Sequence, residues 1–173
     1  MADTGSWCEG DWALILGSSS GFGEAAAIEL AKLGMNILGV HLDRKSTLPN
    51  ADRIVADIRA LGREVIFFNA NAADPEKRGE ILKHMAQRAQ ESGKPTFVRV
   101  LLHSLAFGTL KPYIAKSSAE AINKAQMDMT LDVMAHTLVY WTQDLVAQGF
   151  LGQGSRIFSM TSTKRELLKP RLF

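Results

Sequence analysis

The most informative stretch of this 173-residue chain is WALILGSSSGFG, residues 12–23. Its first five residues are apolar and indicate a buried strand, whereas EAAAIELAKL at 24–33 is rich in helix formers and stops at Gly34. A glycine-rich turn therefore joins a strand to a helix. Gly17 permits the tight turn, Gly21 lets the backbone approach a diphosphate, and Gly23 lets the helix pack closely on the strand. Backbone N–H groups and the positive end of the helix dipole would hold that diphosphate. Further contacts are expected from the other residues of the turn, Ser18, Ser19, Ser20 and Phe22.

Apolar and amphipathic segments alternate along the rest of the chain. Further strands are predicted at Asn36–Val40, Val65–Phe68, Phe97–Leu102 and Arg156–Met160. Helices are predicted at Pro49–Leu61, from the Asp74 cap to about Gln90, and from an Asn123 capping box to about Gln148. This order predicts an α/β fold, a doubly wound parallel sheet of the Rossmann type. We expect one domain over residues 1–173, C-terminally incomplete and truncated after the fifth strand, with ligands bound at the carboxyl ends of the strands.

Composition excludes several classes of protein. The formal charge of +2 is too small to indicate binding to nucleic acid or to an anionic membrane. No apolar run reaches the roughly 18 residues of a membrane span, and the N-terminus lacks the apolar core of a signal peptide. Cys8 is the only cysteine, so an intramolecular disulfide is impossible. His84 and His136 have no second ligand at metal spacing, so no metal site is expected. A cytoplasmic location fits these features.

The spacing GxxxGxG resembles that of the short-chain dehydrogenase/reductase superfamily, and the resemblance extends from about residue 10 to residue 162. It implies binding of NAD(H) or NADP(H). Asn71, followed by Ala72, matches the acidic position that meets the adenine edge. The run His103-Ser104-Leu105-Ala106 matches Asn-Asn-Ala-Gly, which lies over the nicotinamide. Thr161-Ser162 matches the Ser-Ser that follows the fifth strand, which makes Ser162 the one catalytic candidate, with Met160 beside the cofactor.

The residues at the end of the second strand carry signals for both dinucleotides. His41 occupies the place of the acid that binds the ribose hydroxyls in members that prefer NAD. Asp43 would bind a 2′-hydroxyl and favour NAD(H), whereas Arg44, Lys45 and a charged His41 would bind a 2′-phosphate and favour NADP(H). Because no acid stands at the expected place, NADP(H) is slightly preferred over NAD(H).

The turn His103–Phe107 is similar to the His-Ser-Ile-Gly-Phe of bacterial enoyl-acyl-carrier-protein reductases, which transfer hydride to the β-carbon of an enoyl thioester. The common form of the glycine loop instead favours reduction of a ketone or a 3-ketoacyl thioester. The superfamily places a catalytic tyrosine and lysine shortly after Ser162, but residues 163–173 contain no tyrosine. The chain is therefore expected to be a truncated reductase or an inactive dinucleotide-binding fragment. The complete protein would act on a small-molecule or acyl-thioester substrate as a homo-oligomer, a dimer or tetramer.

Overall fold

The computed structural model describes residues 10–93 and 96–161. Within these residues the strands form a five-stranded parallel sheet in the order β3-β2-β1-β4-β5. The strands are β1 (Trp12–Leu16), β2 (Asn36–His41), β3 (Val65–Asn69), β4 (Val98–His103) and β5 (Arg156–Ser159). All five predicted strands are confirmed. The strand order reverses between β1 and β4, so the crevice that such sheets use for ligands opens at the carboxyl end of β1.

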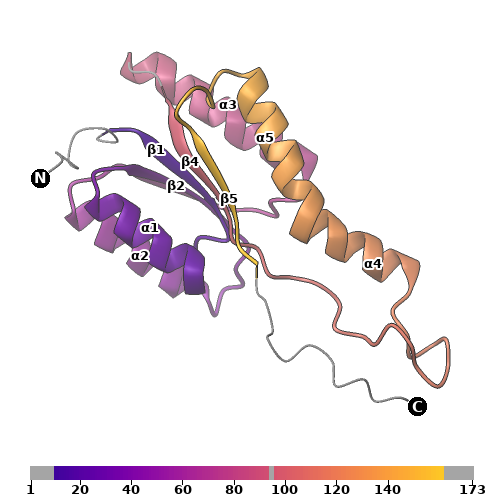
Figure 1. Ribbon diagram of the computed structural model, residues 1–173. Coiled ribbons are helices and arrows are strands. Elements are labelled where there is room, and N and C mark those ends of the chain that lie inside the picture. The colour runs from indigo at the N-terminus through magenta and orange to yellow at the C-terminus, as the bar shows by residue number, and fades with distance from the viewer. Residues whose placement is uncertain (1–9, 94–95, 162–173) are drawn as a thin grey trace, which may run out of the picture.

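Helices cover both faces of the sheet, which confirms the doubly wound, Rossmann-type fold. The helical segments are α1 (Gly21–Lys32), α2 (Leu48–Ala60), α3 (Pro75–Ser92), α4 (Lys124–Leu131), η1 (Asp132–His136) and α5 (Thr137–Ala147). Figure 1 shows α1 and α2 on one face and α3 and α5 on the other, with α4 extending beyond the sheet. The two predicted caps are also confirmed. Asp74 accepts hydrogen bonds from the backbone of Glu76 and Lys77, and Asn123 forms a reciprocal capping box with Gln126.

Alternate residues of the strands supply two separate apolar cores. In β1, Ala13 and Ile15 face α1 and α2, whereas Leu14 and Leu16 face α3 and α5. All four side chains are fully buried. A strand that is buried on both faces must be apolar throughout, which explains why β1 appears in the sequence as a continuous apolar run. Each buried Leu or Ile side chain contributes about 1.5–3 kcal/mol relative to exposure, so these strands fix the frame that carries the site.

The prediction of one continuous helix from Asn123 to about Gln148 is wrong, because the π turn η1 interrupts the helix between α4 and α5. The segment η1 is a π turn, in which the Thr137 N–H donates to the Asp132 carbonyl five residues earlier. The Thr137 hydroxyl donates to the same oxygen at 2.7 Å. The neighbouring Val133 carbonyl accepts a hydrogen bond from His103 Nε2 at 3.2 Å, which joins the π turn to the end of β4. Apolar residues continue at helical spacing through the turn, so their periodicity does not reveal it.

The edge strand β5 is exposed along its whole length, unlike the four other strands. Ile157 and Phe158 are each about half exposed, although strands of a doubly wound sheet are normally covered on both faces. Among the helices of the described ranges, none has the length and apolar character needed to cross a bilayer.

Candidate functional site

The glycine-rich turn at the end of β1 is closed by contacts that only glycine permits. Its backbone is bound to β2, since the N–H groups of Gly17 and Ser18 both donate to the Val40 carbonyl, at 2.8 and 3.3 Å. A Cβ at Gly17 would lie 2.5 Å from the Ser104 carbonyl oxygen, and φ is +90° there. A Cβ at Gly23 would lie 1.9 Å from the Gly17 carbonyl oxygen. The tight turn at Gly17 and the close packing of helix on strand at Gly23 therefore have the predicted geometry.

The first turn of α1 presents free backbone donors. Ser20 is the N-cap residue but makes no side-chain cap hydrogen bond, and the Glu24 N–H to the Ser20 carbonyl is the first bond of the helix, at 3.2 Å. The N–H groups that precede Glu24 have no partner within the helix. A Cβ at Gly21 would meet nothing within 4 Å, so the backbone is open to an approaching ligand there. Together with the positive end of the helix dipole, these donors suit a diphosphate.

Two side chains of α2 fix the turn from the other side, and neither was predicted from the sequence. Asn50 Nδ2 donates to the Ser19 carbonyl at 2.6 Å and to Glu24 Oε2 at 3.0 Å. Arg53 forms an ion pair with the same Glu24 carboxylate. An asparagine at the start of an amphipathic helix is typical of any solvent-facing position, so the sequence does not indicate that Asn50 binds the turn. Ser18 is fully buried, with its hydroxyl 3.5 Å from the Val40 carbonyl, and Phe22 is largely exposed.

The end of β2 holds a buried pair of side chains. His41 Nδ1 donates to Asp43 Oδ2 at 2.7 Å, and the two side chains are only 4% and 13% exposed. Burial alone would raise the pKa of Asp43. Hydrogen bonds from Ser19, Thr47 and His41, together with the charge attraction of His41, more than offset burial and lower that pKa below its ordinary value. Asp43 is therefore ionised at neutral pH.

The two cations that follow this pair lie in the open. Arg44 and Lys45 are both exposed at the same edge of the sheet as the glycine turn. The structure therefore separates the residues that the sequence presented as one run of charges: Asp43 is buried against His41, whereas Arg44 and Lys45 reach into solvent.

The residues after β3 lie at the same edge of the sheet. Asn71 Oδ1 accepts from the Ala73 N–H at 3.0 Å, which leaves the side-chain amide free to donate. The Ala72 carbonyl accepts from Trp141 Nε1 at 2.9 Å, so this loop is fastened to α5. A contact between Asn71 and an adenine edge stays a prediction.

The residues after β4 face the glycine turn. The Ser104 N–H donates to the Leu16 carbonyl at 2.8 Å, and the Leu105 side chain borders Gly17. His103, at the end of the strand, is 1% exposed, and burial lowers its pKa, an effect that its bond to the Val133 carbonyl partly offsets. Because a carbonyl oxygen only accepts, Nε2 of the neutral ring carries the proton. Ala106 is exposed beyond the strand.

The end of β5 completes this edge. The Met160 N–H donates to the His103 carbonyl at 2.9 Å, and the Met160 side chain is 43% exposed. Ser162, the predicted catalytic residue, lies outside the described residues. The other predicted site residues all follow the carboxyl ends of β1 to β5, where the loops meet (Figure 1). Their contacts with a cofactor stay predictions.

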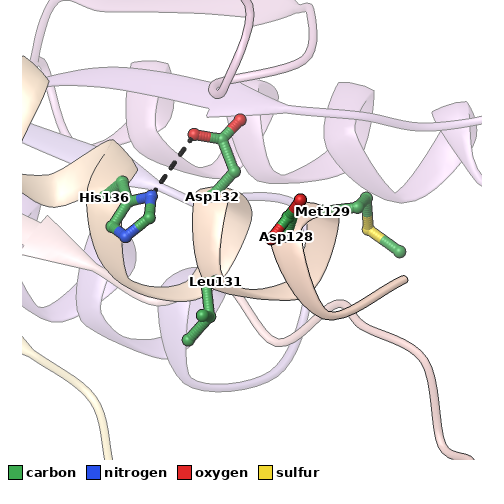
Figure 2. A pocket seen from close by; sticks show the side chains of 5 residues that line it. All are labelled: Asp128, Met129, Leu131, Asp132 and His136. Atoms are coloured by element: carbon green, nitrogen blue, oxygen red, sulfur yellow. Dashed lines mark ion pairs between the residues drawn. The ribbon is translucent and has the colours of Figure 1, made fainter. Parts of the chain in front are cut away.

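A second group of polar residues lies on α4 and η1 and carries no comparable chemistry. Figure 2 shows the Asp132 and His136 side chains next to each other on the π turn. Asp132 Oδ1 lies 3.8 Å from His136 Nδ1. Both residues line a shallow depression, together with Asp128, Met129 and Leu131. Within the described ranges, no three His, Cys, Asp or Glu side chains gather closely enough to hold a metal ion. The depression is open to solvent and is lined only by residues of these two helical segments.

Comparisons with known proteins agree with this geometry. The family model described as short chain dehydrogenase matches residues 11–167. A curated relative, the NADPH-dependent aldehyde reductase-like protein of Arabidopsis thaliana chloroplasts, is 29% identical over 168 residues, which is 91% of this chain and 57% of that protein. The 3-oxoacyl-[acyl-carrier-protein] reductase of Synechocystis is 39% identical over 71 residues, covering 41% of this chain and 28% of that protein.

Solved structures show the same fold. The promiscuous reductase LugOII, which catalyses keto-reduction during lugdunomycin biosynthesis, superimposes with a TM-score of 0.71 at 24% identity, over 89% of this chain and 59% of that one. The matches cover most of this chain, but the chain spans little more than half the length of these proteins. Since the family model covers nearly the whole sequence, the chain belongs to the short-chain dehydrogenase family.

Proposed function

We propose that this chain is the dinucleotide-binding part of an NAD(P)H-dependent reductase. The observation that carries the proposal is the unfilled first turn of α1, where free N–H groups and the absent side chain of Gly21 leave room for a diphosphate. The bound dinucleotide would supply a hydride. The residues of this chain would bind the diphosphate, enclose the nicotinamide beneath the turn after β4, and orient the substrate.

We propose NADP(H) as the preferred cofactor. Arg44 and Lys45 are exposed just after the end of β2, where a 2′-phosphate would lie, and both are cationic residue types that pair with phosphate. A relative described as NADPH-dependent supports the same choice.

The substrate we propose is an acyl thioester, with an enoyl thioester first. The supporting observation is the run His103–Phe107 at the end of β4, which differs from the usual Asn-Asn-Ala-Gly. By the family resemblance, this run would lie over the reacting end of the cofactor. A 3-oxoacyl thioester or another carbonyl compound is the second candidate, favoured by relatives described as 3-oxoacyl-carrier-protein and aldehyde reductases. Both reductions need a proton donor besides the hydride, and Ser162 alone would orient a carbonyl but not protonate it.

Binding is the first test. The chain should bind NADPH, measured by the change in cofactor fluorescence, and Gly21→Ala should weaken binding by at least about tenfold, because its methyl group occupies the place of the diphosphate. Gly62→Ala is a matched control: Gly62 also has positive φ and open space around its Cβ position, but it follows the C-cap of α2 and has no predicted ligand role. Equal NADPH affinity in both variants would contradict the proposal.

Turnover is the second test. NADPH oxidation would be followed with crotonyl and with acetoacetyl thioesters. Faster oxidation with the crotonyl thioester supports the enoyl assignment, and faster oxidation with the acetoacetyl thioester supports the carbonyl one. Dinucleotide binding without turnover of either would identify the chain as an inactive dinucleotide-binding fragment.

A further inference from the structure

The side-chain amide of Asn50, near the start of α2, has a hydrogen-bond partner for each of its groups. Its Nδ2 donates to the Ser19 carbonyl at 2.6 Å and to Glu24 Oε2 at 3.0 Å. Its Oδ1 accepts from the Arg53 guanidinium at 2.9 Å. Carbonyl and carboxylate oxygens only accept, whereas a guanidinium only donates, so these partners fix which side of the amide faces the turn.

The contact with the Ser19 carbonyl fixes the peptide that leads into α1. Ser20 is the N-cap residue of α1, so the bond between Ser19 and Ser20 is the last peptide before the helix. This peptide is trans, and the C=O and N–H of a trans peptide point in opposite directions. A carbonyl held by Asn50 therefore directs the Ser20 N–H away from α2. One side chain of α2 thus sets the orientation in which the chain enters the helix.

The contact with Glu24 bears on the charge of the same helix end. Glu24 lies in the first turn of α1, where a carboxylate is favourable for the helix dipole but adds negative charge close to the end that would bind an anion. Its carboxylate accepts from Asn50 Nδ2 and is paired with Arg53, and its side chain is only 24% exposed. Both partners belong to α2, so the acid of the first turn is held towards α2.

We infer that Asn50 is a positioning residue for the diphosphate site. It touches no cofactor itself, but it holds the peptide before α1 and the acid of the first turn, and it thereby keeps the free N–H groups of that turn in place for a diphosphate. This inference rests on the proposed dinucleotide binding and deepens it. Because NADPH and NADH carry the same diphosphate, loss of Asn50 weakens the binding of both by the same factor.

The binding experiment removes the donors of Asn50 in two ways. Asn50→Asp keeps the shape of the side chain and the acceptor for Arg53 but loses both amide donors, and it should lower the NADPH and NADH affinities about tenfold each. Asn50→Leu removes the donors without adding a charge beside Glu24, and it should lower both affinities in the same way.

Asn36→Asp is the matched control, at the amino end of the sheet. Asn36 is the first residue of β2, and its Nδ2 donates to the Gly10 carbonyl at 3.0 Å while its Oδ1 accepts from the Glu64 N–H at 2.9 Å. The control therefore removes a comparable side-chain bond to a backbone carbonyl. It should lower the melting temperature and leave both affinities unchanged.

A measurement on the ligand-free chain tests the mechanism directly. The Glu24 N–H donates to the Ser20 carbonyl at 3.2 Å, which is the first bond of α1. Once the peptide before the helix is no longer held, this bond opens more often. Amide hydrogen exchange at Glu24 should therefore be faster in both Asn50 variants than in the unmodified chain, and unchanged in Asn36→Asp.

The proposed function and this inference fail in different ways. If the unmodified chain binds neither dinucleotide, both are overturned. If it binds them and the Asn50 variants keep their affinity, only the inference is overturned, and dinucleotide binding stands. The inference is also overturned if Asn36→Asp weakens binding as much as Asn50→Asp does, or if the NADPH and NADH affinities fall by different factors.

Discussion

Replacing Gly23 by alanine should disrupt the site and destabilise the domain, because the added methyl group would clash with the backbone of the turn. The added Cβ would lie 1.9 Å from the Gly17 carbonyl oxygen, 2.8 Å from the Gly17 carbonyl carbon and 3.3 Å from the Ser18 Cα. Real Cβ atoms almost never come within 3.0 Å of another atom, so α1 and the turn must separate by about 1 Å. All three contacts are with backbone, so no change of rotamer relieves them.

The cost follows from overpacking. Forced insertions of this kind cost about 1–3 kcal/mol, and a backbone-to-backbone clash belongs at the upper end. For a domain of this size, each kcal/mol lowers the melting temperature by roughly 2–4 °C, so Gly23→Ala should melt roughly 6–12 °C lower. NADPH binding should also be lost, because moving α1 away from the turn displaces the N–H groups that hold the diphosphate.

The matched variant is Gly21→Ala, in the same turn. Its Cβ meets nothing within 4 Å, and its cost in stability is the strain of an alanine at φ +57°, about 1 kcal/mol. Thermal unfolding followed by circular dichroism should therefore separate the two variants clearly, although both lose NADPH binding. If Gly23→Ala melts within about 2 °C of the unmodified chain, the close packing inferred between α1 and the turn is wrong.

Three further outcomes are expected. Because burial lowers the pKa of His103, the unfolded chain takes up a proton before the folded chain does as pH falls. The free energy of unfolding should therefore decrease between about pH 7 and the lower pKa of the folded state. In denaturant titrations, His103→Asn should flatten this part of the pH profile, and an unchanged slope would refute the assignment. Arg78→Met should lower the free energy of unfolding by about 1 kcal/mol in thermal melts, because Arg78 pairs with the partly exposed Asp144 at 2.6 Å. Asp144→Asn should lower the free energy of unfolding by no more than Arg78→Met does. A larger loss would mean that the pair is not screened by solvent. Met134 and Val139 are about half exposed on the helical segments that follow β4, so we expect them to lie in a homo-oligomer contact. Val139→Lys should shift the sedimentation coefficient towards that of the monomer. Identical sedimentation of the variant and the unmodified chain would refute the contact.

The strands and most helix boundaries were predictable from the sequence because each depends on local residues. A strand buried on both faces has to be apolar throughout, and Asp74 and Asn123 mark helix starts by hydrogen bonds that reach only two or three residues ahead. The π turn was not predictable. It depends on a bond between Val133 and His103, thirty residues apart, and no periodicity in either segment encodes that contact.

The same distinction separates the parts of the site. The glycine spacing was informative because a Cβ at Gly17 or Gly23 would clash with neighbouring backbone, whereas the open space at Gly21 leaves room for a ligand. Asn50 and Asn69 were missed because each acts across elements: Asn50 binds the Ser19 carbonyl, and Asn69 binds the backbone of Asp43. Their residue type is compatible with any loop or helix start, so only the assembled fold reveals what they hold.

The choice of dinucleotide shows most clearly why a charge pattern alone is ambiguous. In the sequence, Asp43, Arg44 and Lys45 are three consecutive charges of opposed meaning, and their order does not say which faces the ligand. The fold separates them. β2 ends at His41, whose ring is buried against Phe67 of β3, and the Asp43 carboxylate binds Nδ1 of that ring. The carboxylate is therefore held by its neighbour, whereas the two cations are exposed to solvent. A rigid carboxylate loses no side-chain entropy when it accepts a ribose hydroxyl, whereas Arg44 and Lys45 must each be ordered before they hold a phosphate. That difference offsets the advantage of two cations over one anion, and it is why we expect only a modest preference for NADP(H) until Asp43 is replaced.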